Sequence, residues 1–331
     1  MTSVDNKLVR KTRYHINRIE KQIELMGSRQ KWLRVTAALN VLEDTNSAIT
    51  YYRESEYPDE LNGKYLFTYG LLQALFVQED AVNSINIALF DKEVDFKTDY
   101  PAAYAVREIR DDVVGHPTNR KNREFIYLVQ HSLSKEGFKY FKAEVGDNHS
   151  SHIDVNVEKA ISDVTSCINT VLSAAIESLD NEFREYINRH RNRKMGNIFQ
   201  QLEYAREKVL TDDYMAEWGY KSTKSMVAKC EEELRLRYGD IDTVDGYKYL
   251  LSSIRELYDL IDNRIQQIPQ ELQSTIKKYL LQQLFVNLEE LKSCCTETDQ
   301  YFENYGKEVF ECSEDMGSPQ IEFTGQEDLS E

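Results

Sequence analysis

An arginine and a histidine stand close together in the stretch Arg110 to His116, which reads Arg-Asp-Asp-Val-Val-Gly-His and is followed by Pro117. The arginine is charged at any physiological pH and can hold phosphate oxygens through two parallel hydrogen bonds. Histidine is the side chain best suited to give or take a proton near pH 7. The pattern indicates metal-independent phosphodiester chemistry, for which RNA is the natural substrate because its 2′-hydroxyl is an internal nucleophile.

Spacing alone does not single out this pair, because Arg10 with His15 and Arg184 with His190 are spaced similarly. Those two pairs lie in long charged helical stretches that the pattern predicts to be solvated faces. Arg110 instead ends a short, largely apolar helix that Gly115 and Pro117 are expected to stop. An aspartate, Asp111, also follows it directly, whereas Lys11 and Glu185 stand at this position in the other two pairs.

Upstream, the sequence from Tyr69 to Val82 predicts a mostly buried helix that carries the polar residues Gln78, Glu79 and Asp80. A buried helix followed by a short helix with Arg, Asp and then His-Pro resembles the HEPN superfamily (higher eukaryotes and prokaryotes nucleotide-binding domain). The family signature is an Arg, four to six residues with a polar one favoured first, and a His, which Arg110, Asp111 and His116 match. The resemblance covers about residues 40 to 190.

Many members of this superfamily are ribonucleases of toxin–antitoxin, phage-defence and CRISPR-linked systems. The resemblance implies a homodimer whose two facing motifs form one composite, metal-independent endoribonuclease site without a cofactor. Arg110 and His116 would be catalytic and Asp111 would orient one of them. The implied products are a 2′,3′-cyclic phosphate and a 5′-hydroxyl.

Neighbouring residues have expected supporting roles. Arg107 and Asp111, four residues apart on one helix, are expected to pair and to leave Arg110 facing the substrate. Glu79 and Asp80 are expected to support the motif from the preceding helix. The cations expected to bind RNA are Arg107, Arg120, Lys121 and Arg123.

A second function stays open from the sequence. Some HEPN domains bind rather than cut, so the chain is also compatible with a non-catalytic dimeric scaffold. It would equally suit a regulatory subunit that binds a nucleotidyltransferase or nuclease. A partner protein such as an antitoxin, or another component of a defence system, fits either function.

The composition sets further limits. Five prolines and thirteen glycines among 331 residues, with many helix-forming residues, predict an all-α fold. The net charge of −16 argues against a broad nucleic-acid-coating surface, although it permits a local basic cleft. The five cysteines show no Cys-x-x-Cys spacing and are expected to be reduced thiols. No apolar leader or membrane-spanning run is present, which predicts a cytoplasmic protein without a membrane partner.

The expected fold is a HEPN-like helical bundle with one small β-hairpin and a second helical region. Helices are predicted over about 4–55, broken at Gly27-Ser28, and over about 64–90, 102–115 and 154–190. The hairpin pairs 125–129 with 138–142, whereas Asn148 to His152 is expected to be a loop. Five more helices are predicted near 197–210, 222–238, 244–267, 270–293 and 297–311.

Four regions follow from these elements. Residues 1–56 are N-terminal helices that pack on the core, and 57–194 are the HEPN-like domain with its hairpin near 125–145. Residues 195–312 form a C-terminal helical domain. The acidic stretch 313–331 has little apolar surface to bury and is expected to be a disordered tail.

Overall fold

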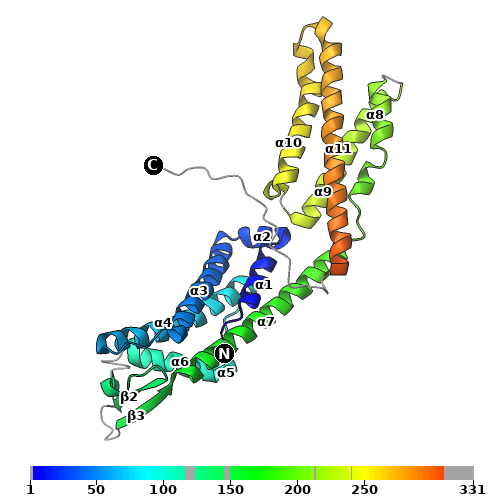
Figure 1. Ribbon diagram of the computed structural model, residues 1–331. Helices are drawn as coiled ribbons and strands as arrows, with labels where there is room; N and C mark the ends of the chain where they lie inside the picture. Colours follow the sequence, from blue (N-terminus) through cyan, green and yellow to red (C-terminus); the bar gives the residue numbers. More distant parts are fainter. Residues whose placement is uncertain (1–2, 116–123, 145–149, 212–213, 240, 309–331) are drawn as a thin grey trace. The chain divides into compact units, whose positions relative to one another are not determined.

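The computed structural model describes residues 3–115, 124–144, 150–211, 214–239 and 241–308 (Figure 1). The protein is 80% helical, with eleven α-helices and one three-stranded antiparallel sheet in the described residues. This confirms the prediction of a mostly helical fold with a small β insertion. The chain divides into two compact units, Met1–Asp180 and Asn181–Glu331. The acidic stretch 313–331 lies outside the described residues.

The first unit begins with α1 (Asn6–Ile16), α2 (Ile19–Met26), α3 (Arg29–Glu54) and α4 (Leu61–Phe90). The predicted break at Gly27-Ser28 is present, and a second break after Ile16 separates α1 from α2. Asp5 begins α1, because its Oδ1 accepts a hydrogen bond from the backbone N–H of Lys7 at 2.8 Å. Helices α3 and α4 pack along each other (Figure 1).

The core of the first unit lies between α3, α4 and α7 (Val157–His190). Apolar residues recur every three or four positions along α7, at Ile161, Val164, Ile168 and Leu172, and all four are fully buried. This spacing places them on one face of the helix, so burying that face holds α7 against the bundle.

A short segment carries the Arg110 motif. It consists of α5 (Phe96–Asp99), α6 (Pro101–Arg110) and one π turn (Asp111–Gly115). Pro101 stands at the first helical position, where its missing N–H costs nothing. The prediction of a helix over about 102–115 is therefore confirmed, with the difference that its last turn widens into a π-helix. Such single π turns are frequent at functional sites.

The sheet follows as β1 (Glu124–Leu128), β2 (Gly137–Glu144) and β3 (Ser150–Asn156), paired in that order. A short 3₁₀ turn (Gln130–Ser132) lies between β1 and β2. One face of the sheet is buried through Ile126, Leu128, Phe138, Tyr140 and Val155. The predicted hairpin is confirmed.

The prediction of a loop at Asn148 to His152 was wrong for the described residues from Ser150 onward, which form β3. The third strand depends on its partner: β2 supplies the hydrogen bonds along its length, from Gly137 to Ala143. The sequence of β3 is largely polar, and apolar and polar residues alternate only weakly along it. Gly137 allows the close approach of the two backbones, since a Cβ there would clash with the carbonyl oxygen of Val155.

The second unit contains α8 (Leu202–Leu210), α9 (Ala216–Tyr238), α10 (Asp245–Asp259) and α11 (Gln270–Glu308). Short turns complete it: Gly196–Phe199, Ile241–Thr243, a π turn at Leu260–Arg264, and Ile265–Gln267. Two helices predicted near 270–293 and 297–311 are one continuous helix, α11, beside α10 (Figure 1). Among the described helices, none combines the length and the apolar character that crossing a bilayer requires.

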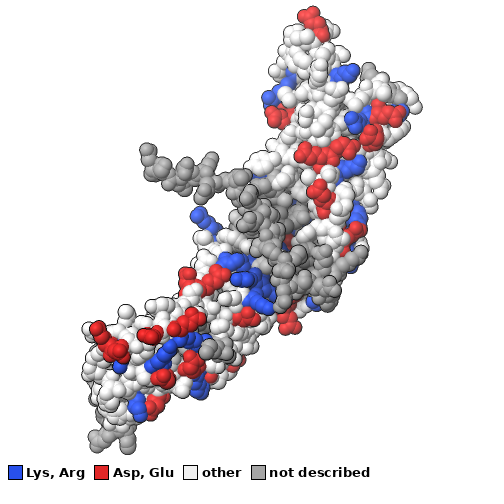
Figure 2. Space-filling view, viewed as in Figure 1, with Lys and Arg blue, Asp and Glu red and all other residues white. Residues whose placement is uncertain are grey.

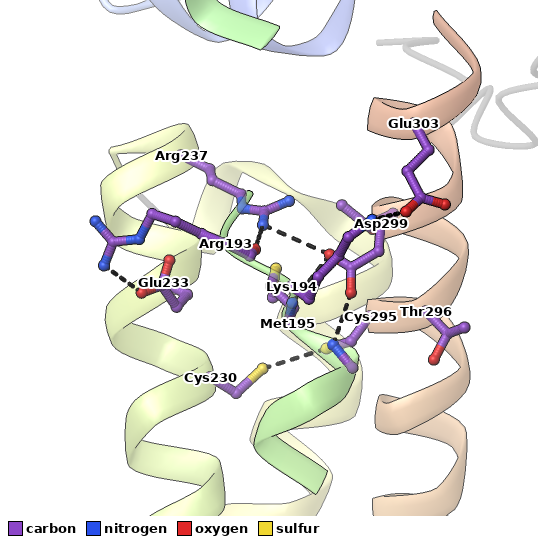
Figure 3. A network of polar contacts seen from close by, with 12 residues as sticks. Arg193, Lys194, Met195, Cys230, Glu233, Arg237, Cys295, Thr296, Asp299 and Glu303 are labelled. Carbon is purple, nitrogen blue, oxygen red and sulfur yellow. Dashed lines mark hydrogen bonds and ion pairs between the residues drawn. The ribbon is translucent and has the colours of Figure 1, made fainter. Parts of the chain in front are cut away.

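A buried polar network fixes the chain where α7 ends (Figure 3). Asp299 on α11 accepts hydrogen bonds from the backbone N–H groups of Met195 and Gly196, at 2.9 and 2.8 Å. It also forms an ion pair with Arg237, at 3.6 Å, and Arg237 donates to the carbonyl oxygen of Arg193. The residues after the basic run at 189–194 are thus held by α9 and α11. The division between the two compact units falls earlier, inside α7.

Candidate active site around Arg110

Arg110 ends α6, and residues on both sides hold its guanidinium. Gln73 on α4 accepts two hydrogen bonds through Oε1, from Nε at 3.1 Å and from Nη2 at 2.8 Å. Asp111 Oδ1 accepts a third from Nη1 at 2.9 Å. The Arg110 side chain is 20% exposed. Its guanidinium is therefore held by Gln73 and Asp111 and is still accessible to solvent. A guanidinium held in this way loses little freedom when it binds an anion.

Gly115, the residue before His116, lies over this guanidinium. A Cβ added at Gly115 would be 3.2 Å from Arg110 Nη1 and 3.5 Å from Asp111 Oδ1. The π turn and the absence of a side chain at Gly115 therefore bring the backbone close to the arginine. His116 itself lies outside the described residues, as do Arg120, Lys121 and Arg123.

The predicted pair between Arg107 and Asp111 was wrong. Arg107 turns toward α4, where Nη2 bonds Asp80 Oδ1 at 2.9 Å and Nη1 contacts Glu79 Oε2 at 3.4 Å. Asp111 pairs with Arg110 instead. Two acids from a neighbouring helix compete for Arg107 more effectively than one acid four residues along its own helix. Glu79 and Asp80 therefore support Arg107 rather than Arg110.

Phe76 on α4 joins the two arginines. The guanidinium carbons of Arg107 and Arg110 lie 4.3 and 4.0 Å from the centroid of its half-buried ring. Both distances are well inside the range of a cation–π interaction. The aromatic ring thus gives the two cations a common support.

Glu79 is fully buried, and only one of its oxygens has a hydrogen-bond partner among the described residues. Burial raises the pKa of this carboxyl to about 7, against the opposing influence of Arg107; Asp80 and Asp111 raise it further. The charge of Glu79 in turn raises the pKa of the buried Cys167 thiol, although burial is the larger cause there. A carboxyl in this state takes up and releases a proton near neutral pH.

We expect Glu79→Gln to change how stability depends on pH. The folded pKa lies above the ordinary value of 4.5, so the folded state binds the proton more tightly than the unfolded state. The free energy of unfolding of the natural protein should therefore fall as the pH rises from about 4.5 to about 7. Glutamine resembles the protonated carboxyl and does not titrate.

The variant should thus gain about 1–3 kcal/mol relative to the natural protein between pH 5 and pH 8. Denaturant titrations at the two pH values measure this difference. Asp80→Asn, at a half-exposed neighbour, is the control and should shift the difference little. An equal effect of Glu79→Gln at both pH values would contradict the assignment.

The π turn is also tied to the sheet. Asp112 is buried and its Oδ2 accepts from the Tyr140 hydroxyl and from Lys142 Nζ, each at 3.3 Å. Lys142 also pairs with Glu124 at 3.1 Å. The sheet therefore fixes the backbone directly after Arg110, a role that the sequence did not reveal.

The two other arginine–histidine pairs differ from the predicted solvated faces, because both histidines are buried. His15 Nε2 lies 3.1 Å from an oxygen of Asp180, and burial lowers the pKa of His15 to about 4. His190 is buried against Tyr186 and Phe302. Because both are buried, neither histidine is available to a substrate.

Sequence reasoning missed Gln73, although a signal for it exists. Gln73 and Asp80 are seven residues apart on a largely apolar helix, which places both on one face, with Phe76 between them. A polar residue that shares a face with the predicted cluster could have been included on that basis. Its partner, Arg110, could not be deduced.

Acidic and basic groups are mixed near Arg110 in the described residues: the bases Arg107, Arg110 and Lys142 stand with the acids Glu79, Asp80, Asp111 and Asp112. Acidic and basic groups are likewise interspersed on the visible face in Figure 2. The described residues hold no group of three or more His, Cys, Asp or Glu placed to bind a metal ion.

Comparisons with family models, with curated proteins and with solved structures gave no match to this chain.

Proposed function

We propose that the protein is a metal-independent endoribonuclease of the HEPN type, in which Arg110 stabilises the phosphate and His116 transfers protons. The observation that carries the proposal is the state of the Arg110 guanidinium. Of its five N–H groups, three bond Gln73 and Asp111. One N–H on each terminal nitrogen then has no hydrogen bond to a described residue, which suits a two-point contact with a phosphate.

The chemistry assigns each group a step. A base removes the proton of the 2′-hydroxyl, the 2′-oxygen attacks phosphorus, and the 5′-oxygen leaves with a proton from an acid. Arg110 offsets the negative charge that grows on the phosphate oxygens. The products are a 2′,3′-cyclic phosphate and a 5′-hydroxyl. One His116 cannot be base and acid in the same step, so two copies are required.

A row of exposed residues on α4 supports the pairing of two copies. Leu66 and Tyr69 are 72% and 38% exposed, and Gly70 has open space where a side chain would lie. Leu66, Gly70 and Gln73 are spaced by four and three residues, so they share one helix face. Because Gln73 holds Arg110, a partner seated on this row would bring its own Arg110 toward the first. We therefore propose a homodimer with one composite site, which acts as a defence or toxin effector.

The alternative is a non-catalytic scaffold or regulatory subunit. The acids around Arg110 favour it, since this part of the site alone attracts a polyanion weakly. Incubation of the purified protein with total RNA in EDTA separates the two functions. Cleavage that survives EDTA and leaves cyclic phosphate ends supports the ribonuclease, whereas intact RNA supports the scaffold.

Gln73→Ala should reduce cleavage by about tenfold to a hundredfold, because Arg110 would lose two of its three hydrogen bonds and the orientation they impose. The turnover number should fall more than the affinity for RNA, since the charge remains. Gln73→Glu, which keeps an acceptor oxygen, should be less impaired in orienting Arg110 but should weaken RNA binding. Unchanged turnover by Gln73→Ala in single-turnover assays would contradict this role.

A further inference from the structure

The outer face of the sheet carries a row of rings, one from each strand. Tyr127 of β1 is paired with Phe141 of β2, which is paired with His152 of β3. The rings of Tyr127 and Phe141 are stacked, with centroids 4.8 Å apart and planes at 25°. The His152 ring meets Phe141 edge-on, at 5.4 Å and 66°. The strand register therefore aligns three planar groups directly across the sheet.

This row faces solvent. Tyr127 is 58% exposed, and Phe125, two residues earlier on the same face of β1, is 48% exposed. The alternate residues Ile126 and Leu128 point the other way and are buried. A solvated face of an antiparallel sheet ordinarily carries polar residues, so exposed aromatic rings there indicate a binding surface.

The opposite face of the same sheet is tied to the candidate active site. Tyr140 and Lys142 on β2 contact Asp112, which lies in the π turn two residues after Arg110. The strand β1 also packs against this turn. The ring row and Arg110 thus belong to one compact unit and are joined by buried contacts.

We propose that the row of Tyr127, Phe141 and His152 binds the bases of single-stranded RNA by stacking. The choice of RNA rests on the proposed function. Because Phe141 stacks on one face of the Tyr127 ring, a base would extend this stack on the other face of Tyr127. Every base has a face that stacks on an aromatic ring in this way. The cation on this face, Lys139, already pairs with Asp154 at 2.9 Å, so stacking rather than phosphate binding is the main contribution here.

The sequence just before β1 is basic. Between Gly115 and Glu124, where β1 begins, the chain carries Arg120, Lys121 and Arg123 and no acid. A cationic stretch therefore leads directly into the first strand of the ring row. Aromatic groups next to cations are the combination by which proteins bind single-stranded nucleic acid.

Binding of a fluorescent single-stranded RNA of about 12 nucleotides, a length within the range of such sites, tests the proposal. The full chain carries Arg110→Ala so that the RNA is not cut. Adding Tyr127→Ala should weaken binding about tenfold, which corresponds to the loss of one stacked base. Tyr127→Trp should retain binding. Tyr279→Ala, at a tyrosine on α11 that is 67% exposed, is the matched control and should bind normally.

A second measurement covers the case in which Tyr127→Ala disturbs the sheet. The indole introduced by Tyr127→Trp should be quenched when RNA is added, and one introduced by Tyr279→Trp should not. Absence of quenching, or equal binding by all variants, overturns the proposal. It is also overturned if Tyr127→Ala leaves RNA binding intact and instead lowers the sedimenting mass, since the face would then join two copies.

The two proposals can fail separately. RNA binding that depends on Tyr127 without any cleavage by the natural protein would remove the ribonuclease and leave the stacking surface. Cleavage that Tyr127→Ala does not impair, with unchanged binding, would remove the stacking surface and leave the ribonuclease.

Discussion

Arg110→Ala is expected to lower RNA cleavage by at least about two orders of magnitude, the usual effect of removing a group that stabilises transition-state charge. The same loss is expected for His116→Ala, which would remove a proton-transfer group. Single-turnover cleavage of a labelled RNA in EDTA measures both. Folding should be little changed for Arg110→Ala, because the side chain is partly exposed and its contacts with Gln73, Asp111 and Phe76 lie at the edge of the core.

Arg10→Ala provides the matched control, because Arg10 is an exposed arginine followed by a histidine at similar spacing. It should cleave normally. The histidines of the other two pairs are unsuitable controls, since both are buried and their removal would destabilise the fold. Full activity of Arg110→Ala, or its loss in Arg10→Ala, would show that the wrong pair has been chosen.

A composite site also predicts that cleavage requires two associated copies of the chain. Leu66→Asp places a charge in the exposed row on α4 and should lower both self-association and cleavage. Sedimentation of the variant measures the first. A variant that is monomeric and fully active would exclude the composite mechanism while leaving the catalytic role of Arg110 intact.

Asp299→Ala should destabilise the second unit by about 3–5 kcal/mol, the typical cost of leaving a buried charge without its partner. The Arg237 side chain is fully buried, and Asp299 is the carboxylate that pairs with it in the network of Figure 3. The change also removes the acceptor for two backbone N–H groups, at Met195 and Gly196. Denaturant unfolding followed by the fluorescence of Trp218 on α9 reports on this unit.

Glu303→Ala is the control from the same helix. Glu303 pairs with Lys194 and is 55% exposed, so its removal should cost less than about 1 kcal/mol. Adding Arg237→Leu to Asp299→Ala should recover part of the lost stability, because the unpaired buried charge is then gone. If the double variant is no more stable than Asp299→Ala, the backbone hydrogen bonds rather than the ion pair dominate at this site.

Local patterns in the sequence were sufficient for several parts of this protein. The periodic apolar residues of α7 identified a helix, and the two runs around Ser134–Gly137 identified a hairpin. The motif helix was recognised from Pro101 and Gly115 at its ends. These features depend on backbone geometry over one or two turns, which neighbouring residues determine.

Partners distant in the sequence were decided only by the tertiary structure. Arg107 had a suitable acid four residues away, yet it pairs with Glu79 and Asp80, because packing of α6 on α4 places two carboxylates within reach. Arg110 is held by Gln73 for the same reason.

The sequence by itself therefore determined the helical class and the hairpin. The tertiary structure alone decided the third strand, the continuity of α11, the burial of His15 and His190, and the partners that orient Arg110. The physical reason is that a helix or a turn is stabilised by bonds among near neighbours. The third strand, the burial of a histidine and the choice of an acidic partner for an arginine instead depend on groups that are distant in the sequence. Only folding brings those groups together.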